Sequence, residues 1–130
     1  MGKSILIGKL IYNALISDTE ISNTVGTKVF PLVAENDTQF PFIVYSKTNA
    51  YAVTLTKDGV LGDAVTFSIT VVSDKYFESC EIAQEVRDLF ENCIISNNDL
   101  KIYNIRMTSI TESYNADAFT QELQFECEAE

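Results

Sequence analysis

A chain of 130 residues is the length of one domain, and a hydrophobic content of 46% suits a packed core rather than a disordered chain. Nineteen acidic residues against nine basic ones give a formal charge of −10, which argues against binding of nucleic acid through its phosphates. The chain has no histidine, and its three cysteines (Cys80, Cys93 and Cys127) are widely spaced, so we expect no metal site and no cofactor. An odd cysteine count without a signal peptide indicates synthesis in a reducing cytoplasm.

The first forty residues predict two short helices and an edge strand. Ser4–Ile16 is too short to span a bilayer and is interrupted by Lys9, so we expect a docked helix rather than a targeting segment. Its apolar stripe consists of Ile7, Leu10, Ile11, Ala14 and Leu15. Ser17-Asp18 supplies a cap for a second helix, Thr19–Val25, which Gly26 closes. The following strand, Lys28–Val33, contains Pro31, which cannot donate to a ladder and places it at an edge or ends it early.

A strand and a hairpin are predicted next. Phe40–Tyr45 is almost continuously apolar, a pattern typical of a strand covered on both faces. Further along, Asp58-Gly59 separates two strand-like arms, Tyr51–Thr56 and Val60–Thr66, which favours a hairpin. These arms carry few large apolar side chains, so we expect the hairpin to project from the sheet.

The centre of the chain predicts a strand that leads directly into a helix. Ala64–Ser73 alternates apolar and small polar residues, with Val65, Phe67, Ile69 and Val71 facing inward. The period then changes to three or four residues over Lys75–Cys93, which predicts an amphipathic helix. Asp74 precedes this change and is the expected cap. The predicted apolar stripe consists of Tyr76, Cys80, Ile82, Ala83, Val86, Leu89, Phe90 and Cys93.

Two further strands complete the predicted fold. In Leu100–Glu112 the apolar residues change face, which indicates a bulge or bend near Tyr103–Asn104. After a turn at Asn115–Asp117, the last strand alternates strictly: one face is apolar, and the other carries Glu126, Glu128 and Glu130. We therefore predict one α+β domain with a mainly antiparallel or mixed sheet, packed against an N-terminal helix and a central amphipathic helix at about 75–93.

No catalytic residues are predicted. Cysteine or serine nucleophiles would need lysine or an N-terminal amine as base, because there is no histidine. The five glycines form no phosphate-binding pattern. Paired carboxylates of the glycosidase kind stay open, since spacing in sequence does not fix spacing in space. The acidic helix residues allow two interpretations, a solvated face or a face for a partner or channel; they are Glu78, Glu81, Glu85, Asp88 and Glu91.

The order of these elements resembles the tail-completion or tail-terminator proteins of long-tailed bacteriophages and prophages. The resemblance spans nearly the whole chain, so residues 1–130 are expected to form one tail-terminator-like domain. It rests on short hydrophobic motifs in a fixed order, which are Val25-Gly26, Val29-Phe30-Pro31, Phe40–Tyr45, Phe67–Ser73, Tyr76 and Ile82–Phe90.

The resemblance implies a virion structural protein with no enzyme activity. It implies a ring, commonly a hexamer, that caps the head-proximal end of the tail tube, ends tube growth and joins the tail to the head connector. The partners would be other copies of the chain, the tail-tube protein and a head-connector or neck protein. DNA would only pass through the lumen, no membrane would be involved, and the protein would be made in the cytoplasm of a bacterial host.

Two sets of site residues follow as hypotheses. Because an isolated two-stranded ribbon is seldom stable, the hairpin is a candidate subunit interface or else a flexible surface loop; its residues are Tyr51, Val53, Leu55, Lys57, Asp58, Val60 and Leu61. Glu126, Glu128 and Glu130 could face the lumen and repel passing phosphates. The alternatives are a head-closure or other neck protein, and a bacterial protein-interaction adaptor domain.

Overall fold

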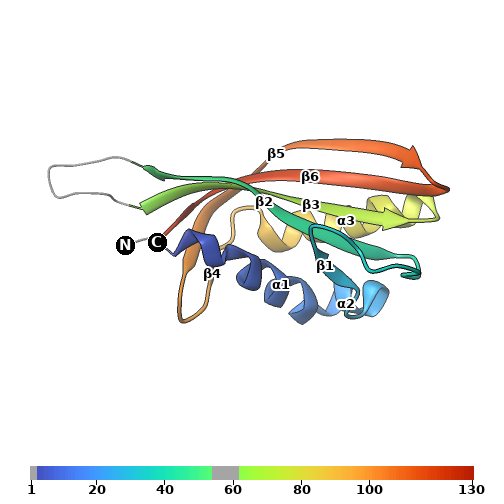
Figure 1. Cartoon of the computed structure of the whole chain (residues 1–130), viewed down its shortest axis with the longest axis horizontal. Coiled ribbons are helices and arrows are strands. Elements are labelled where there is room, and N and C mark those ends of the chain that lie inside the picture. Colours follow the sequence, from blue (N-terminus) through green and yellow to red (C-terminus); the bar gives the residue numbers. More distant parts are fainter. Residues whose placement is uncertain (1–2, 54–61) are drawn as a thin grey trace, which may run out of the picture.

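The computed structural model describes residues 3–53 and 62–130, in which a long curved sheet has its helices on one face (Figure 1). The helical layer consists of α1 (Ile7–Ser17), which a short 3-10 turn at Ser4–Leu6 precedes, α2 (Thr19–Val25) and α3 (Tyr76–Phe90). The predicted α+β class is confirmed. The other face of the sheet carries no helix within the described residues.

The sheet has six strands in the order β1-β2-β3-β6-β5-β4. Their bounds are β1 (Val29–Pro31), β2 (Phe42–Val53), β3 (Gly62–Ser73), β4 (Ile95–Ser96), β5 (Lys101–Asn115) and β6 (Ala118–Ala129). β1 runs parallel to β2, and all other neighbours are antiparallel. Four long strands therefore form the body of the sheet, and two very short ones cover part of each edge.

The two N-terminal helices match their prediction. α1 buries Ile7, Leu10, Ile11 and Leu15, as its stripe requires. Asp18 caps α2 by accepting a hydrogen bond from the Ile21 amide at 3.0 Å. Gly26 ends α2 with a φ of 64°, in the region that favours glycine.

The predicted start of α3 is wrong in detail. The N-cap residue is Lys75, and Asp74 is exposed without a capping bond. Ser73 satisfies the backbone there instead, because its hydroxyl accepts from the Lys75 amide at 3.0 Å and donates to Glu78 at 2.6 Å. The helix also ends at Phe90, so Cys93 lies beyond it.

The prediction that the strand at Phe40–Tyr45 is covered on both faces is also wrong. Within β2, Ile43 and Tyr45 are buried against the helices, whereas Phe42 and Val44 are half-buried on the other face. The ring of Phe42 is sheltered by Phe30 and Phe40, with centroids 6.4 and 5.8 Å away. Aromatic neighbours thus take the place of a second covering layer.

The predicted irregularity in β5 is confirmed. The pairing of β5 with β6 shifts between Tyr103 and Arg106, and Asn104 has a φ of 51°. This bulge allows both Ile102 and Ile105 to face the core, in which both are fully buried. A second shift, between Met107 and Ser109, has no signal in the apolar pattern.

A single hydrophobic core lies between the sheet and the helices. Its centre is three fully buried rings, in which Phe67 stacks on Phe125 at 5.2 Å and meets Phe90 edge-on at 5.7 Å. Because the core uses only one side of the sheet, the opposite side is free to serve another purpose.

Candidate functional site

Outside the apolar corner at Phe42 and Val44, the uncovered face of the sheet is polar, and short hydroxyl side chains dominate it. We use the term uncovered face for the outward residues of the four long strands. They include Ser46 and Thr48 of β2, Thr66, Ser68 and Thr70 of β3, Thr120, Glu122, Gln124, Glu126 and Glu128 of β6, and Arg106, Ser109, Thr111 and Ser113 of β5. Such a face needs no hydrophobic cover, because its side chains can hydrogen-bond to water or to each other.

Many of these hydroxyls are paired across strands. The hydroxyls of Ser46 and Ser68 lie 2.9 Å apart, and Thr48 donates to Thr66 at 2.8 Å. At the other end of the sheet, Ser113 and Thr120 form the same kind of pair. Cross-strand pairs fix the side-chain positions, so the uncovered face is ordered as well as polar.

The three acids that the sequence singled out all interact with β5. Glu126 pairs with Arg106, and Glu128 accepts a hydrogen bond from the side-chain amide of Asn104 at 2.5 Å. Glu130, just after β6, lies 3.5 Å from the Lys101 ammonium. The acids therefore lie on the predicted strand face, and each is engaged by a basic or amide side chain.

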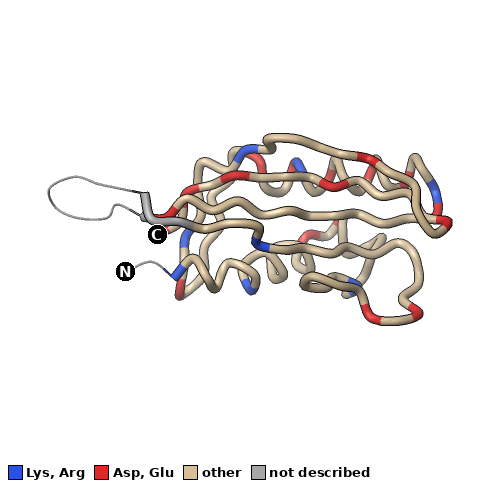
Figure 2. The backbone as a smooth tube through the Cα atoms, turned by 45° about the horizontal axis from the view of Figure 1, so that its top comes forward, with Lys and Arg blue, Asp and Glu red and all other residues tan. Residues whose placement is uncertain are grey.

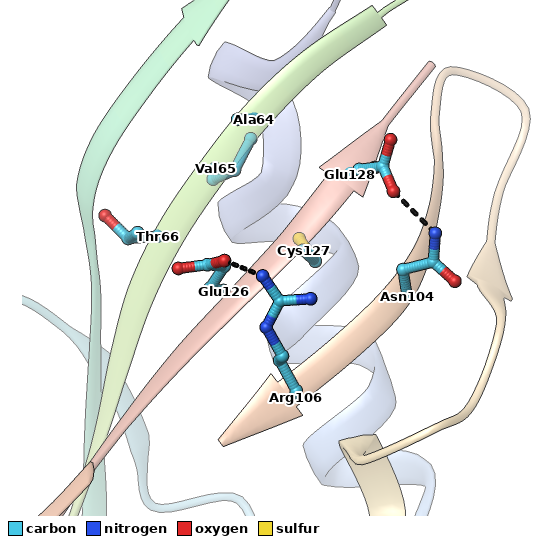
Figure 3. A pocket seen from close by; sticks show the side chains of 8 residues that line it. All are labelled: Ala64, Val65, Thr66, Asn104, Arg106, Glu126, Cys127 and Glu128. Atoms are coloured by element: carbon cyan, nitrogen blue, oxygen red, sulfur yellow. Dashed lines mark hydrogen bonds and ion pairs between the residues drawn. The ribbon is translucent and has the colours of Figure 1, made fainter. Parts of the chain in front are cut away.

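Glu126 and Glu128 border a hollow of about 160 Å³ on the uncovered face (Figure 3). The hollow lies where the β5 bulge parts the strands; its lining is Ala64, Val65, Thr66, Asn104, Arg106, Glu126, Cys127 and Glu128. Among the described residues, the lining contains one basic side chain, Arg106, and Glu126 binds it. The described lining of the hollow thus provides no unpaired basic side chain for an anion.

Acidic residues recur over both layers of the described chain, whereas basic residues are few and scattered (Figure 2). Glu122 of β6 adds a further carboxylate to the uncovered face, opposite Thr111. Sequence reasoning missed Glu122, although its even position in the alternating strand was the signal that could have found it.

The predicted hairpin interface is placed only in part. Tyr51 and Val53 belong to β2, where their backbones pair with those of Ala64 and Gly62 in β3. The remaining members, Leu55, Lys57, Asp58, Val60 and Leu61, lie outside the described residues.

Among the described residues, which include the acids of α3, no group of three metal-ligating side chains suitable for an ion occurs. Glu85 lines a cleft of about 320 Å³ between α2 and α3 together with Asp18, Glu20 and Asp88. Its pKa is raised, first by burial and then by the neighbouring carboxylates. The pKa of Glu91 is lowered instead, because Arg87 and the Met107 amide both donate to it.

A second surface, which the sequence did not predict, borders the inner side of β5. α3 covers β3 and β6 but leaves the far half of β5 bare, so Ile110 is 48% exposed and Tyr114 is 59% exposed. Two adjoining hollows lie there, of about 140 and 250 Å³, between α3 and β5. We call this surface the β5 groove; its lining includes Tyr76, Cys80, Met107, Ile110, Glu112, Tyr114 and Phe119.

The β5 groove is held together by a small polar network. The Tyr76 hydroxyl donates to Glu112 at 2.9 Å, which is the main reason that its pKa rises to about 12. Gln121 donates to the same carboxylate at 3.1 Å. The network fixes Glu112 beside an apolar wall.

The buried thiol is unsuited to nucleophilic chemistry. Cys127 is fully enclosed in the core, and burial, followed by the nearby Glu128 and Glu126, raises its pKa to about 12.

None of the helices in the described part of the chain is long and apolar enough to cross a membrane.

Comparison with known proteins gives one family and a shared fold. The family model described as tail completion protein gp17 matches residues 9–129. A chain in a solved structure described as a virion of a native gene transfer agent particle shares 17% identity, has a TM-score of 0.79, and covers 97% of this chain and 96% of its own length. A second solved structure, with no descriptive name, shares 12% identity and has a TM-score of 0.70, covering 98% and 96%. No curated protein matches the chain.

Proposed function

The chain belongs to the tail completion protein gp17 family, and from this membership we propose that it is a tail terminator. The family makes it a structural protein of a phage tail. In the proposed role, a ring of identical copies caps the head-proximal end of the tail tube, ends tube polymerisation and joins the tail to the head connector. The whole chain, residues 1–130, acts as one tail-terminator-like domain with no catalytic role.

The proposed ring is a hexamer located at the neck end of the tail in the virion. Its protein partners are further copies of itself, the tail-tube protein and a head-connector or neck protein, all made in the cytoplasm of the bacterial host. The fold shared with a chain of a gene transfer agent virion supports a virion location.

The observation that carries the proposal is the uncovered face of the sheet. A sheet with helices on one side and an ordered polar surface on the other can line a channel without exposing its core. Several hydroxyls are paired with each other, and Arg106 is paired with Glu126, so DNA that passes this face meets no free basic side chain among its described residues.

We assign Glu126, Glu128 and Glu130 to the lumen of the ring, where they repel phosphates and let DNA slide. A triple Glu→Lys variant should assemble but eject DNA poorly, because the lysines would bind phosphate. The matched triple Glu→Gln variant changes the same side chains without adding cations, and it should eject nearly normally. Normal ejection by assembled particles of the lysine variant would contradict the lumen assignment.

We assign the hairpin to contacts between subunits, through Tyr51, Val53, Leu55, Lys57, Asp58, Val60 and Leu61. The described ends of β2 and β3, Val53 and Gly62, extend past the helical layer (Figure 1), which supports a contact with a neighbouring copy at this end of the sheet. In a head-to-tail ring, the surface at this end of the sheet would meet a different patch on the neighbouring copy.

The proposed function is tested by the mass of the purified protein in light scattering, alone and with purified tail-tube protein. A ring mass alone, or a ring formed on tube ends together with arrest of tube growth, is the expected result. A monomer that ignores the tube would overturn the terminator role and favour a connector-side neck protein instead.

A further inference from the structure

β5 is a long edge strand, and its regular part beyond Ser109 has little to prevent it from pairing. β4 pairs only with Lys101 and Ile102, so within the described residues the edge from Tyr103 to Asn115 has no strand beside it. Natural edge strands usually block such pairing with lysine, proline, a bulge or a very short length. Two bulges interrupt β5 before Ser109, and the Asn92 amide already donates to the Ile105 carbonyl, but Ile110–Asn115 contains no bulge, lysine or proline. A free edge of this kind is a template for another strand.

The geometry of the β5–β6 turn shows which backbone groups of β5 are free. Ala116 and Asp117 both have positive φ, 49° and 63°, as in a two-residue type I′ turn. Asn115 and Ala118 therefore form the hydrogen-bonded pair that closes the turn, and hydrogen-bonded pairs alternate along the strands from there. It follows that the amides and carbonyls pointing away from β6 belong to Ile110, Glu112 and Tyr114.

The side chains of these same three residues face the β5 groove. A strand added to β5 would place alternate side chains beside Ile110 and Tyr114 and would cover their exposed apolar surface. Backbone hydrogen bonding and apolar burial thus favour the same occupant, an extended strand.

The opposite edge of the sheet is also open. β1 covers β2 only at Ile43–Tyr45, which leaves Ser46–Val53 without a neighbour on that side among the described residues. The four long strands alternate in direction, so β2 and β5 run in opposite directions. When one copy is rotated beside another, β5 and the neighbour's β2 are therefore antiparallel, and the alternation continues through the joint.

We propose that the free edge of β5 pairs with the free edge of β2 in a second copy of the chain. This inference rests on the proposed function, because it specifies how neighbouring subunits of the ring join. The contact is heterologous, with different patches on the two partners, as a ring requires. It extends the sheet from subunit to subunit and keeps the uncovered faces on one side.

The short end strands make the joint staggered. The register can be followed across the sheet, because Ser46 pairs with Ser68, Ser68 with Gln124, and Gln124 with Ser109. Ser46, where the free edge of β2 begins, therefore lies level with Ser109 of β5. The regular part of β5 beyond Ser109 lies level with the portion of β2 that β1 covers. To use this part, the neighbour must slide along the strands, away from its own hairpin end and toward its β5–β6 turn.

One pair of variants tests the backbone contact. Ile110→Pro removes an outward amide that β6 does not use, so the monomer should keep its fold. Ile110→Thr keeps the amide and also loses apolar surface. We expect the proline variant to weaken self-association at least about tenfold, and the threonine variant much less. Equal association of the two variants would contradict the strand pairing.

A cysteine scan identifies the occupant and remains informative if the proline variant does not fold. In a Cys80→Ser, Cys93→Ser background that removes the two half-buried native thiols, Thr48→Cys in β2 is combined in turn with Ser109→Cys, Thr111→Cys or Ser113→Cys in β5, and disulfide formation is measured under mild oxidation. We expect chains of linked subunits for at least one combination, and none for the single variants or the background protein. Self-linked dimers of a β5 single variant would mean β5-to-β5 pairing and overturn the proposal.

The remaining outcomes separate this inference from the proposed function. Rings that form without any β5–β2 link would overturn the edge pairing alone. Links that form in a protein that neither binds nor caps tail tubes would support the edge pairing and overturn the terminator role. A protein that stays monomeric with and without tube protein, and forms no links, would overturn both.

Discussion

Single residues show how strongly position within this fold controls chemistry. Cys127 faces the core between two carboxylates on the same strand, whereas Cys80 and Cys93 are only half-buried. At pH 8 we expect Cys127 to react with a thiol reagent at least about a hundredfold more slowly than the other two, because both access and its raised pKa of about 12 oppose thiolate formation.

This prediction is checked by counting reactive thiols with and without urea. Two should react in the folded protein and all three after unfolding. A Cys127→Ala variant should leave the fast-reacting thiols unchanged. Three thiols that react at one rate in folded protein would show that the core around Phe125 opens readily.

Glu85 provides the second prediction at this scale. One of its oxygens is buried without a hydrogen-bond partner within the described residues, and its pKa is raised by that burial and by Glu20, Asp18, Glu81 and Asp88. A carboxyl group with a raised folded-state pKa costs stability when it is ionised, and this cost disappears below the unfolded-state value. Glu85→Gln should therefore raise the free energy of unfolding at pH 7, by about 0.5 kcal/mol, with a gain that vanishes below about pH 4.5.

The measurement is urea unfolding of both proteins at pH 7 and pH 4. Glu81→Gln is the matched control: Glu81 is exposed, and the variant removes a like charge one helical turn from Glu85. A similar gain from both variants at pH 7 would assign the effect to general charge repulsion, and no pH dependence would contradict the role of Glu85 ionisation.

At the scale of elements, α2 depends on one capping residue. It is a helix of only seven residues, and it brings Ile21 and Val25 into the core. Asp18→Ala removes the bond to the Ile21 amide and should lower the free energy of unfolding by about 1 kcal/mol. Asp18→Asn keeps a capping oxygen while removing the charge, so it should cost much less. Equal losses in urea unfolding would show that charge, rather than capping, matters at this position.

Elements were predictable from the sequence where one local rule acted alone. The parity change across β5 required a bulge, since Ile102 and Ile105 cannot otherwise share a face. β4 is two residues long and carries no periodicity, so only its pairing with Ile102 reveals it. Asp74 satisfied the capping rule, but Ser73 was better placed, and such competition is decided by three-dimensional contacts.

The candidate surfaces, too, were predictable from the sequence only where a local rule applied. Strand alternation placed Glu126 and Glu128 on one face, and the structure agrees. Their partners Arg106 and Asn104 could not be predicted, because the bulge sets the register of β5 against β6. The bare half of β5 was equally hidden, since the length of sheet that α3 covers is a property of packing.

At the scale of the whole molecule, the main feature is the separation of a covered apolar face from an uncovered polar one. The helices complete the core by themselves, so the sheet retains two open edges and a polar surface. A subunit built in this way can be stable alone and still offer its sheet for extension. Assembly then adds backbone hydrogen bonds and covers Ile110 and Tyr114 without rebuilding the core.

Charge opposes that assembly. Each copy carries a formal charge of −10 at pH 7, so neighbouring copies repel one another over the screening length of the solution. That length is about 30 Å at 0.01 M salt and about 10 Å at 0.1 M. We therefore expect self-association to strengthen severalfold between these concentrations, as measured by light scattering at a fixed protein concentration.

The direction of the salt effect distinguishes two kinds of interface. Backbone pairing of β5 with β2 and burial of apolar side chains depend little on salt, so reduced repulsion should dominate. An interface held by ion pairs between copies would weaken as salt is added. The Ile110→Pro variant is the control, because a gain that requires the free β5 edge should be largely lost in it. A salt-induced gain of equal size in the variant would indicate association through some other surface.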